Sequence, residues 1–362
     1  MLRPIPSDPR RILVVRLGSL GDVARVLPML AGLRARFPDA GIDWVVQRKA
    51  VDLLRDHPQI DRLFVVPFRR WRGLATPEGW RLARSMRARS YDLILDFQGS
   101  MKGTLAALLA SRLSARVGWS PLHTEEGTFF LLHGHRTPPG KRVNRHRRFR
   151  SLVDWLDVPD LPGEPPRYDE SDTAPVDRFV AEHESLPRPW VLVYPWTSPA
   201  GAHRRWNLER LKTATREIES RTGGTALVGW GPAEETEARA FVESVEGSVL
   251  APPTTIRGLC YLLERCDLYV GMNTGPMHLA ALVGIPVLAV FGDRSDPELH
   301  TPVAWRAPVE VIATEDARKL KTWERRGVAP FEWPEPGVVV DAAVRLVEAG
   351  RDEAGSAAGT SG

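Results

Sequence analysis

The sequence predicts an α/β protein made of two halves of similar size, each built on a parallel sheet. Short apolar runs alternate with stretches of helical periodicity, which is typical of parallel strands covered by helices on both faces. This alternation occurs twice along the chain, and 362 residues correspond to about two ordinary domains. Because 43% of the residues are hydrophobic and 26% are charged, the chain can bury two sizeable cores, which argues against a mainly disordered protein.

The first half begins with a buried strand at 12–15. A glycine-containing loop follows, and from Asp22 apolar side chains recur at three- and four-residue steps until Pro38 ends the helix. Three more strands are expected, with helical stretches between them, at 42–46, 63–66 and 93–95. In an open parallel sheet ligands bind beyond the carboxyl ends of the strands, so we expect the functional loops at that edge.

The second half is preceded by a passage rich in proline and acidic residues, from about Val158 to Arg188, which is typical of a linker. Four strands are then expected, at 190–194, 226–228, 268–270 and 287–291. We therefore expect an N-terminal domain at 1–170, a second domain at 171–337 and a C-terminal helix at 338–350. This helix is expected to pack back toward the N-terminal domain, and the small, polar tail at 351–362 is expected to be frayed.

The composition excludes several classes of protein. Two cysteines, Cys260 and Cys266, are too few for a disulfide scaffold or a four-cysteine zinc site, and they fit a reducing compartment. The first residues lack the apolar core of a secretory signal. No run approaches the roughly 18 apolar residues of a membrane span, so no transmembrane helix is expected.

The charge is distributed unevenly along the chain. The formal net charge is +4, yet residues 1–170 hold 29 basic and 18 acidic side chains, a net +11, whereas the remaining 20 and 27 give −7. Such an asymmetry suggests two surfaces with different partners. Only 6 of the 49 basic residues are lysine, which reflects either a GC-rich genome or the bidentate grip of arginine on phosphate and carboxylate.

The first candidate loop, Gly18–Asp22, joins a strand to a helix. Its glycines permit a sharp turn, and amides at a helix start can face an anion. The loop lacks both the G-x-G-x-x-G dinucleotide fingerprint and the Gly-Lys-Ser/Thr end of a P-loop. Asp22 is therefore either a carboxylate favoured by the helix dipole or a general base beside a ligand.

The second candidate loop, Gly271–His278, joins another strand to an apolar helix. Pro276 suits the first helical turn, and Asn273 or Thr274 can cap it. The remaining amides can face a diphosphate. His278 lies one turn into the helix, where it is either a packed or capping histidine or a part of this site.

Two further loops follow strands of the second half. One carries hydroxyls and the pair Arg204–Arg205, which is either a solvated basic segment or a group that neutralises a departing phosphate. In the other, Glu234 is either an acidic first-turn residue or an acceptor for ribose hydroxyls. No D-x-D, H-E-x-x-H or C-x-x-C occurs, so we predict no metal site and no cofactor. Amides and arginine would then stabilise a leaving group.

Taken together, these loops resemble glycosyltransferase family nine, the bacterial heptosyltransferases, whose GT-B architecture has two facing Rossmann-like domains and a central cleft. The resemblance covers roughly residues 11–300. It rests on an ordered set of motifs, namely Ile12–Arg16, Gly21–Val23 with Leu27–Pro28, Phe37–Ala40 with Ile42–Val46, Asp96–Lys102, Arg116–Gly118 and Asn273–Ala281. The Asp96–Lys102 segment is more similar to the branch that adds the first heptose than to the one that adds the second.

The resemblance implies an inverting, metal-independent transfer of a heptose from ADP-heptose to the Kdo–lipid A inner core of lipopolysaccharide. The N-terminal domain would bind the acceptor, the second domain would bind the nucleotide sugar, and Asp22 would be the catalytic base. The implied donor-binding residues are Thr197, Ser198, Arg204, Glu234, Asn273, Thr274, Gly275 and His278. The implied acceptor-binding residues are Gly18, Ser19, Gln98, Lys102 and Arg116.

The implied partners are a nucleotide diphosphate sugar and an anionic glycolipid. The protein would act in the cytoplasm of a Gram-negative bacterium, in peripheral contact with the inner face of the inner membrane. The basic first half suits both the glycolipid and that membrane surface.

Three features depart from the family pattern. Asn273 stands where the family usually has Asp, and an amide keeps hydrogen bonds to a sugar but loses the charge. The family often has Lys where this chain has Arg204–Arg205, so either arginine is a candidate for the diphosphate. The segment 319–333 matches nothing in the family.

Three alternatives follow from the residues. A family-nine-like transferase could use another nucleotide sugar for a surface polysaccharide, which Asn273 keeps open. A catalytically silent nucleotide-sugar-binding protein is also possible, although an intact Asp22 argues against it. A nucleic-acid binder should interleave basic and aromatic residues on one surface. The basic stretch Lys141–Arg150 contains a single aromatic residue, Phe149, so we predict no nucleic-acid partner.

Overall fold

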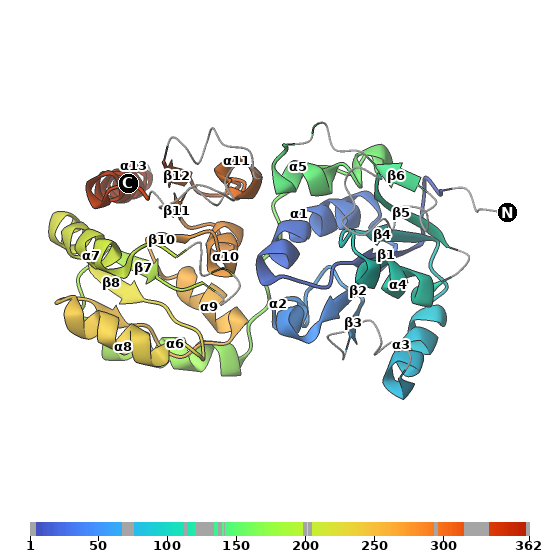
Figure 1. The fold of residues 1–362 in the computed structure, drawn as a ribbon, viewed down its shortest axis with the longest axis horizontal. Coiled ribbons are helices and arrows are strands. Elements are labelled where there is room, and N and C mark those ends of the chain that lie inside the picture. The colour runs from blue at the N-terminus through green and yellow to red at the C-terminus, as the bar shows by residue number, and fades with distance from the viewer. Residues whose placement is uncertain are drawn as a thin grey trace, which may run out of the picture. The chain divides into compact units, whose positions relative to one another are not determined.

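The structure, a computed structural model, describes ten stretches of the chain: 5–66, 76–111, 114–120, 134–136, 140, 142–197, 201, 205–292, 296–314 and 333–359. The chain divides into two compact units, Met1–Arg167 and Tyr168–Gly362. Each unit contains a six-stranded sheet in which every pair of neighbouring strands is parallel (Figure 1). The unit boundary lies three residues before position 170, where we expected it.

The first unit has the strand order β3-β2-β1-β4-β5-β6. Its strands are β1 (Arg11–Val15), β2 (Gly41–Gln47), β3 (Arg62–Val66), β4 (Leu93–Asp96), β5 (Ala115–Trp119) and β6 (Gly134–Arg136). Its helices are α1 (Leu20–Arg36), η1 (Arg48–Ala50), α2 (Val51–Leu54), α3 (Pro77–Arg87), α4 (Met101–Ala110), α5 (Arg145–Arg150) and η5 (Asp154–Leu156). The sequence did not predict β5 and β6 as strands.

Helices cover both faces of this sheet, as the apolar run of β1 requires. Residues 12–15 have no exposed surface, because alternate side chains point to opposite faces and both faces are covered. On one face, Leu13 and Val15 share a core with Met86 of α3 and Ala107 of α4. Helices α1 and α5 pack together on the other face (Figure 1).

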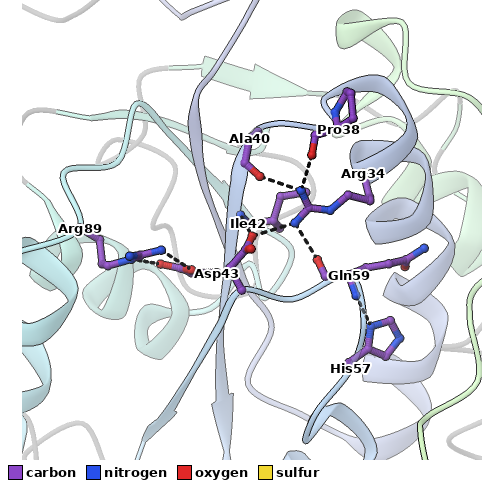
Figure 2. Close-up of polar contacts among 9 residues, drawn as sticks. Arg34, Pro38, Ala40, Ile42, Asp43, His57, Gln59 and Arg89 are labelled. Carbon is purple, nitrogen blue, oxygen red and sulfur yellow. Dashed lines mark hydrogen bonds and ion pairs between the residues drawn. The ribbon is translucent and has the colours of Figure 1, made fainter.

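Arginine–carboxylate pairs tie the amino-terminal edge of this sheet together (Figure 2). Arg34, in the last turn of α1, donates to the carbonyls of Pro38 and Ala40 at 2.9 and 2.8 Å, and to Asp61 at 2.7 Å. In β2, buried Asp43 accepts from Arg89 Nε at 2.7 Å. These bonds supply partners for polar groups in the turns that follow α1 and flank β2, so they stabilise the fold.

The second unit repeats the same strand order, as β12-β11-β10-β7-β8-β9. Its strands are β7 (Trp190–Tyr194), β8 (Thr225–Val228), β9 (Val249–Leu250), β10 (Leu268–Met272), β11 (Val287–Phe291) and β12 (Val309–Ala313). Its helices are α6 (Glu170–Glu182), α7 (Leu208–Thr222), α8 (Glu235–Ser244), α9 (Ile256–Leu263), α10 (Gly275–Val283), α11 (Pro297–His300) and α13 (Pro336–Gly359). The sequence did not predict β9 and β12.

Two expectations about the ends of this unit need correction. The passage that resembled a linker contains α6, which starts with a capping box in which Asp169 and Asp172 each accept from the other's backbone N–H. The C-terminal helix is longer than expected, because it continues past Gly350 to Gly359 where we predicted a frayed tail. Within its own unit it packs against α7 and strands β10–β12, and packing toward the N-terminal domain stays a prediction.

Candidate functional site

Both sheets have the strand order 3-2-1-4-5-6, in which the order of the parallel strands across the sheet reverses between the first and fourth strands. Loops beyond the carboxyl ends of these two strands form the ligand site of an open α/β sheet. In the first unit the switch point lies between β1 and β4, which pair with Val15 opposite Asp96. In the second unit it lies between β7 and β10, which pair with Tyr194 opposite Gly271. Most of the predicted site residues follow one of these strands.

Asp22 lies in the first turn of α1, directly after β1. Its Oδ1 accepts from Arg25 Nη1 at 2.9 Å, and its Oδ2 accepts from Arg16 Nη2 and from Ser19 Oγ, the latter at 3.2 Å. The side chain is 23% exposed. Guanidinium contacts to both oxygens stabilise the ionised carboxylate, which is the form that a general base requires.

Arg16 is anchored by more than its contact with Asp22. Its Nη1 donates to the carbonyl of Phe97 at 2.7 Å, and its guanidinium lies 5.4 Å from the centre of the Phe149 ring. Burial lowers the pKa of Arg16, and the nearby Asp22 carboxylate opposes this shift. Arg16 thus joins β1, the end of β4 and α5 around the carboxylate.

The predicted acceptor residues divide into two groups. Gly18 and Ser19 form the loop before α1, Gln98 follows β4, and exposed Lys102 lies in the first turn of α4, so these four are at the carboxyl edge with Asp22. Gln98 Oε1 accepts from the Leu17 N–H at 3.0 Å, which links the two loops of the switch point. Arg116 is instead the second residue of β5 and donates to the carbonyl of Ser111, before that strand, so the structure does not bring it to Asp22.

Asp96, the last residue of β4, shapes the loop that carries Gln98. Its Oδ1 accepts from the N–H groups of Gln98 and Gly99 at 2.9 and 3.1 Å, and its Oδ2 accepts from Thr104 Oγ1 at 2.9 Å. The side chain is buried, which raises the pKa of Asp96, while these hydrogen bonds act in the opposite direction. With its oxygens engaged within its own loop and helix, Asp96 has a structural role.

In the second unit, the loop after β10 leads directly into α10. Asn273 is buried, Thr274 is the N-cap residue, and Gly275 and Pro276 are the first two helical residues. The Thr274 side chain does not cap the helix, as we had allowed, but donates from Oγ1 to the carbonyl of Met272 at 3.3 Å. The first-turn amides of this helix point beyond the strand ends, and the Thr274 side chain does not cap them. His278, one turn in, is buried.

The loop after β7 lies next to β10 in the sheet. Buried Thr197 has an Oγ1 for which no hydrogen-bond partner exists among the described residues. Ser198 and Arg204, both predicted to bind the donor, lie outside the described residues. Arg205 donates to the carbonyl of Thr197 at 3.3 Å and its guanidinium lies 5.6 Å from the Trp196 ring, so it supports this loop.

Glu234 follows β8, on the other side of β7. Its Oε2 accepts from the Gly231 N–H at 2.8 Å and from Tyr194 Oη at 3.4 Å. These bonds fold the turn between β8 and α8 and hold the carboxylate near the end of β7. Thr197, Glu234 and the start of α10 therefore lie at the same edge of three neighbouring strands.

The described residues contain neither a metal-binding cluster nor a candidate membrane span. No group of three or more His, Cys, Asp or Glu side chains in the described part of the chain is arranged to hold a metal ion. Within the same residues, no helix combines the length and apolar character needed to cross a membrane.

Residues 79–326 match the sequence family described as glycosyltransferase family 9 (heptosyltransferase). The chain belongs to glycosyltransferase family 9. It is therefore an enzyme of the glycosyltransferase class, in the heptosyltransferase family of lipopolysaccharide core synthesis, as the ordered motifs indicated. Lipopolysaccharide heptosyltransferase 1 of Salmonella typhimurium (strain LT2) is 26% identical over 326 residues, which cover 86% of this chain and 98% of the relative.

Solved structures confirm the GT-B architecture of this family 9 chain. The glycosyl transferase family 9 protein from Veillonella parvula DSM 2008 has a TM-score of 0.76 at 20% identity, covering 93% of this chain and 97% of that one. E. coli heptosyltransferase WaaC with ADP gives 0.70 at 20% identity, with 94% and 99% covered. The WaaC complex with ADP-2-deoxy-2-fluoro heptose gives 0.66 at 20% identity, with 85% and 94% covered.

Sequence reasoning did not assign roles to Arg16, Arg25 or Asp96 in this enzyme. Arg16 was noticed only as the end of the first strand, and its contacts to Phe97 and Phe149 join segments about 80 and 130 residues away. A signal for Arg25 was present, because it lies three residues after Asp22 on a helix, where side chains of opposite charge meet.

Proposed function

We propose that this enzyme transfers a heptose from ADP-heptose to the Kdo–lipid A inner core of lipopolysaccharide, with inversion at the anomeric carbon and without a metal ion. The observation that carries the proposal is the Asp22 carboxylate, held by two guanidinium groups at the switch point of the first sheet. The names of its relatives support the substrates, because WaaC was solved with ADP and with an ADP-heptose analogue, and the Salmonella relative is a lipopolysaccharide heptosyltransferase.

The reaction is a single displacement. An acceptor hydroxyl attacks the anomeric carbon of the heptose while its proton moves to Asp22, and the bond from that carbon to the diphosphate oxygen breaks with its electron pair. A general base of this kind contributes about 10²–10⁴-fold to the rate. One displacement inverts the anomeric centre, and the proton then passes from Asp22 to water.

The second unit would hold the donor. The start of α10, which the Thr274 side chain does not cap, would offer amides to the diphosphate, and Thr197 and Ser198 would offer hydroxyls. Arg204 would neutralise the negative charge that develops on the departing ADP, which is the usual task of arginine beside phosphates. Glu234 would accept from the ribose hydroxyls, and Asn273 and His278 would line the sugar. The absence of a D-x-D motif supports leaving-group stabilisation by these groups.

One observation favours a second candidate. Asn273, buried at the end of β10, replaces a carboxylate that is usual in the family, so the donor sugar could differ. A screen in which purified enzyme meets Kdo–lipid A and either ADP-heptose or other nucleotide sugars, followed by mass spectrometry, separates the two. We expect transfer only from ADP-heptose. Transfer only from another sugar nucleotide would show that the enzyme uses that donor instead. Donor binding without any transfer would favour a catalytically silent binding protein.

We also propose that the first unit makes peripheral contact with the anionic inner face of the inner membrane. This unit, residues 1–167, has 29 basic and 16 acidic side chains, a net +13, whereas the second unit has 20 and 29, a net −9. Trp80 of α3 is 63% exposed, with exposed Arg84 one turn further on. Tryptophan and arginine are both favoured at an anionic membrane surface.

Flotation with vesicles of anionic phospholipid tests this contact. We expect Trp80→Ser to reduce bound protein about threefold, and a neutral vesicle to bind little of the native protein. Val338→Ser is the matched control, because Val338 is 52% exposed on α13 in the acidic unit. Equal binding of the Trp80 variant and the native protein would show that α3 does not touch the membrane.

A further inference from the structure

The carboxylate of Asp22 is held by two arginines that come from different parts of the first unit. Arg25, on the same helix, donates to Oδ1 at 2.9 Å, and Arg16, at the end of β1, donates to Oδ2. Both guanidinium side chains are nearly buried, with 9% and 11% of their surface exposed for Arg16 and Arg25. Ion pairs with so little exposure are screened much less by salt than surface pairs.

The two arginines are fixed in different ways. Arg16 also bonds the Phe97 carbonyl at 2.7 Å and lies against the Phe149 ring, so the sheet and α5 determine its position. Arg25 is three residues from Asp22 on α1, so helix geometry determines its distance from the carboxylate. Arg16 can therefore set the orientation of the carboxylate, whereas Arg25 acts mainly through its charge.

Resting on Asp22 as the base of the proposed function, we propose that Arg16 and Arg25 are positioning residues for it. Arg16 holds the carboxylate plane toward the acceptor hydroxyl, and Arg25 keeps the base ionised and disfavours its protonated form. The proton taken from the acceptor then leaves Asp22 readily after each transfer, because a neutral carboxyl between two guanidinium groups is less stable than a carboxylate.

Other charged groups face this cluster and define its electrostatics. From α5, which packs on α1, Arg145 acts on both arginines, and from β4 the buried Asp96 acts on Arg16. Burial lowers the pKa of Arg25 to about 10, against the attraction of Asp22, so Arg25 remains charged at neutral pH. Arg48 and Lys49 of η1, which also packs on α1, are exposed.

The pH dependence of kcat/KM tests the role of Arg25. Removing a guanidinium 2.9 Å from Oδ1 makes the carboxylate easier to protonate. Arg25→Gln should therefore move the acidic limb of the profile to higher pH by about one unit, the lower end of the effect that one arginine has on a neighbouring carboxylate. Arg34→Gln is the matched control, because Arg34 lies on the same helix and its partners among the described residues lie at the amino-terminal edge of the sheet (Figure 2). It should lower Tm without moving the limb.

The split between kcat and KM tests the role of Arg16. Arg16→Met should lower kcat about 10–100-fold with little change in the KM for either substrate, because a misoriented base costs rate. Arg16→Lys, which returns a cation beside Asp22, should recover about a tenth to a half of the lost rate. If the Met variant does not fold, the Lys variant must still show reduced kcat with unchanged KM.

These outcomes separate the inference from the proposed function. An inactive Asp22→Asn together with an unmoved limb in Arg25→Gln and a native kcat in the Arg16 variants would overturn the inference alone. Native turnover by Asp22→Asn would overturn both. A shifted limb and a kcat-only loss, in an enzyme that needs Asp22, would establish both arginines as positioning residues.

Discussion

The switch points of the two sheets have the same topology but opposite states of hydrogen bonding. In the first unit, both oxygens of Asp22 are engaged by arginines, and one of these, Arg16, is itself anchored on the Phe97 carbonyl. In the second unit, Thr197 Oγ1 is buried without a partner among the described residues, and the N-cap residue of α10, Thr274, does not cap the helix with its side chain. One site is completed by the protein, whereas the other presents polar groups that a ligand can satisfy.

This difference has an energetic meaning. A buried donor or acceptor without a partner costs about 1–3 kcal/mol, and a ligand that supplies the partner recovers that energy on binding. A base instead gains from being oriented before the substrate arrives, because reorientation during the reaction would add to the barrier. The comparison therefore predicts that changes at Asp22 affect turnover, whereas changes at the donor loops affect ADP binding.

The largest expected effect tests the first half of this comparison. Asp22→Asn should reduce kcat about 10²–10⁴-fold, because the amide cannot take the acceptor proton. Affinity for ADP, measured by calorimetry, should stay within about twofold of the native value, because Asp22 belongs to the other unit. Asp61→Asn is the control, since Asp61 bonds Arg34 at the opposite end of α1 and should leave kcat unchanged. A large loss of ADP binding in Asp22→Asn would break the comparison.

The next effect concerns the arginine pair of the donor loop. Arg204→Ala should lower kcat/KM for the donor about 10–100-fold, the range of one charge-assisted hydrogen bond to a phosphate. Arg205→Ala should mainly lower Tm, because Arg205 supports the Thr197 carbonyl and the Trp196 ring. If Arg205→Ala lowers kcat/KM for the donor and Arg204→Ala does not, Arg205 is the arginine that contacts the diphosphate.

A smaller effect is expected for the unpartnered hydroxyl itself. Thr197→Val keeps the shape of the side chain and removes Oγ1, so ADP affinity should fall about 3–10-fold, the value of one neutral hydrogen bond, while Tm stays level or rises. Thr215→Val is the matched control, because buried Thr215 donates to the Leu211 carbonyl at 2.8 Å within α7. It should lower Tm slightly and leave ADP binding alone. Unchanged ADP affinity in Thr197→Val would remove Thr197 from the donor site.

The sequence predicted the parts of this arrangement that depend on local pattern. Eight strands and the position of Asp22 at the start of a helix follow from apolar periodicity and loop chemistry. Strand β9 has only two residues and β12 is only half-buried, so neither carries a clear apolar signal. Helix α6 was hidden because it contains Pro175 within an acidic, proline-rich passage.

The contacts that define the Asp22 site could not be predicted, because they depend on tertiary structure. The Phe97 carbonyl meets Arg16 only because β4 is placed beside β1, and Phe149 does so only because α5 packs on α1. Tertiary structure also explains why Arg116 does not lie beside Asp22. Its motif suggested an acceptor role, but Arg116 is near the start of β5, at the amino-terminal edge of the sheet. A sequence motif identifies a candidate residue, but the sheet topology determines at which edge of the sheet that residue lies.

The smallest expected effect is for Glu219, a residue of the second unit that lies away from the donor loops and has an unpartnered polar atom. Glu219 of α7 accepts from the Ala226 N–H at 3.0 Å through Oε1, near the start of β8, while its buried Oε2 has no partner among the described residues. Burial raises the pKa of Glu219 to about 7. If unmet polar groups matter for ADP only at the carboxyl edge, Glu219 should influence stability and not donor binding.

The sign of this effect follows from the raised pKa. Between the pKa of the unfolded chain and about 7, the folded state keeps a proton that the unfolded state has lost, so ionisation of Glu219 destabilises the fold as pH rises through this window. Glu219→Gln lacks this titration. Its free energy of unfolding relative to the native protein should therefore increase by about 1 kcal/mol from pH 5 to pH 8, a value reduced because the side chain is only partly buried. Denaturant unfolding at the two pH values measures it, with ADP affinity at pH 8 as the second readout. If Glu219→Gln lost ADP binding, unpartnered polar groups away from the carboxyl edge of this sheet would also affect the donor, and the comparison would fail.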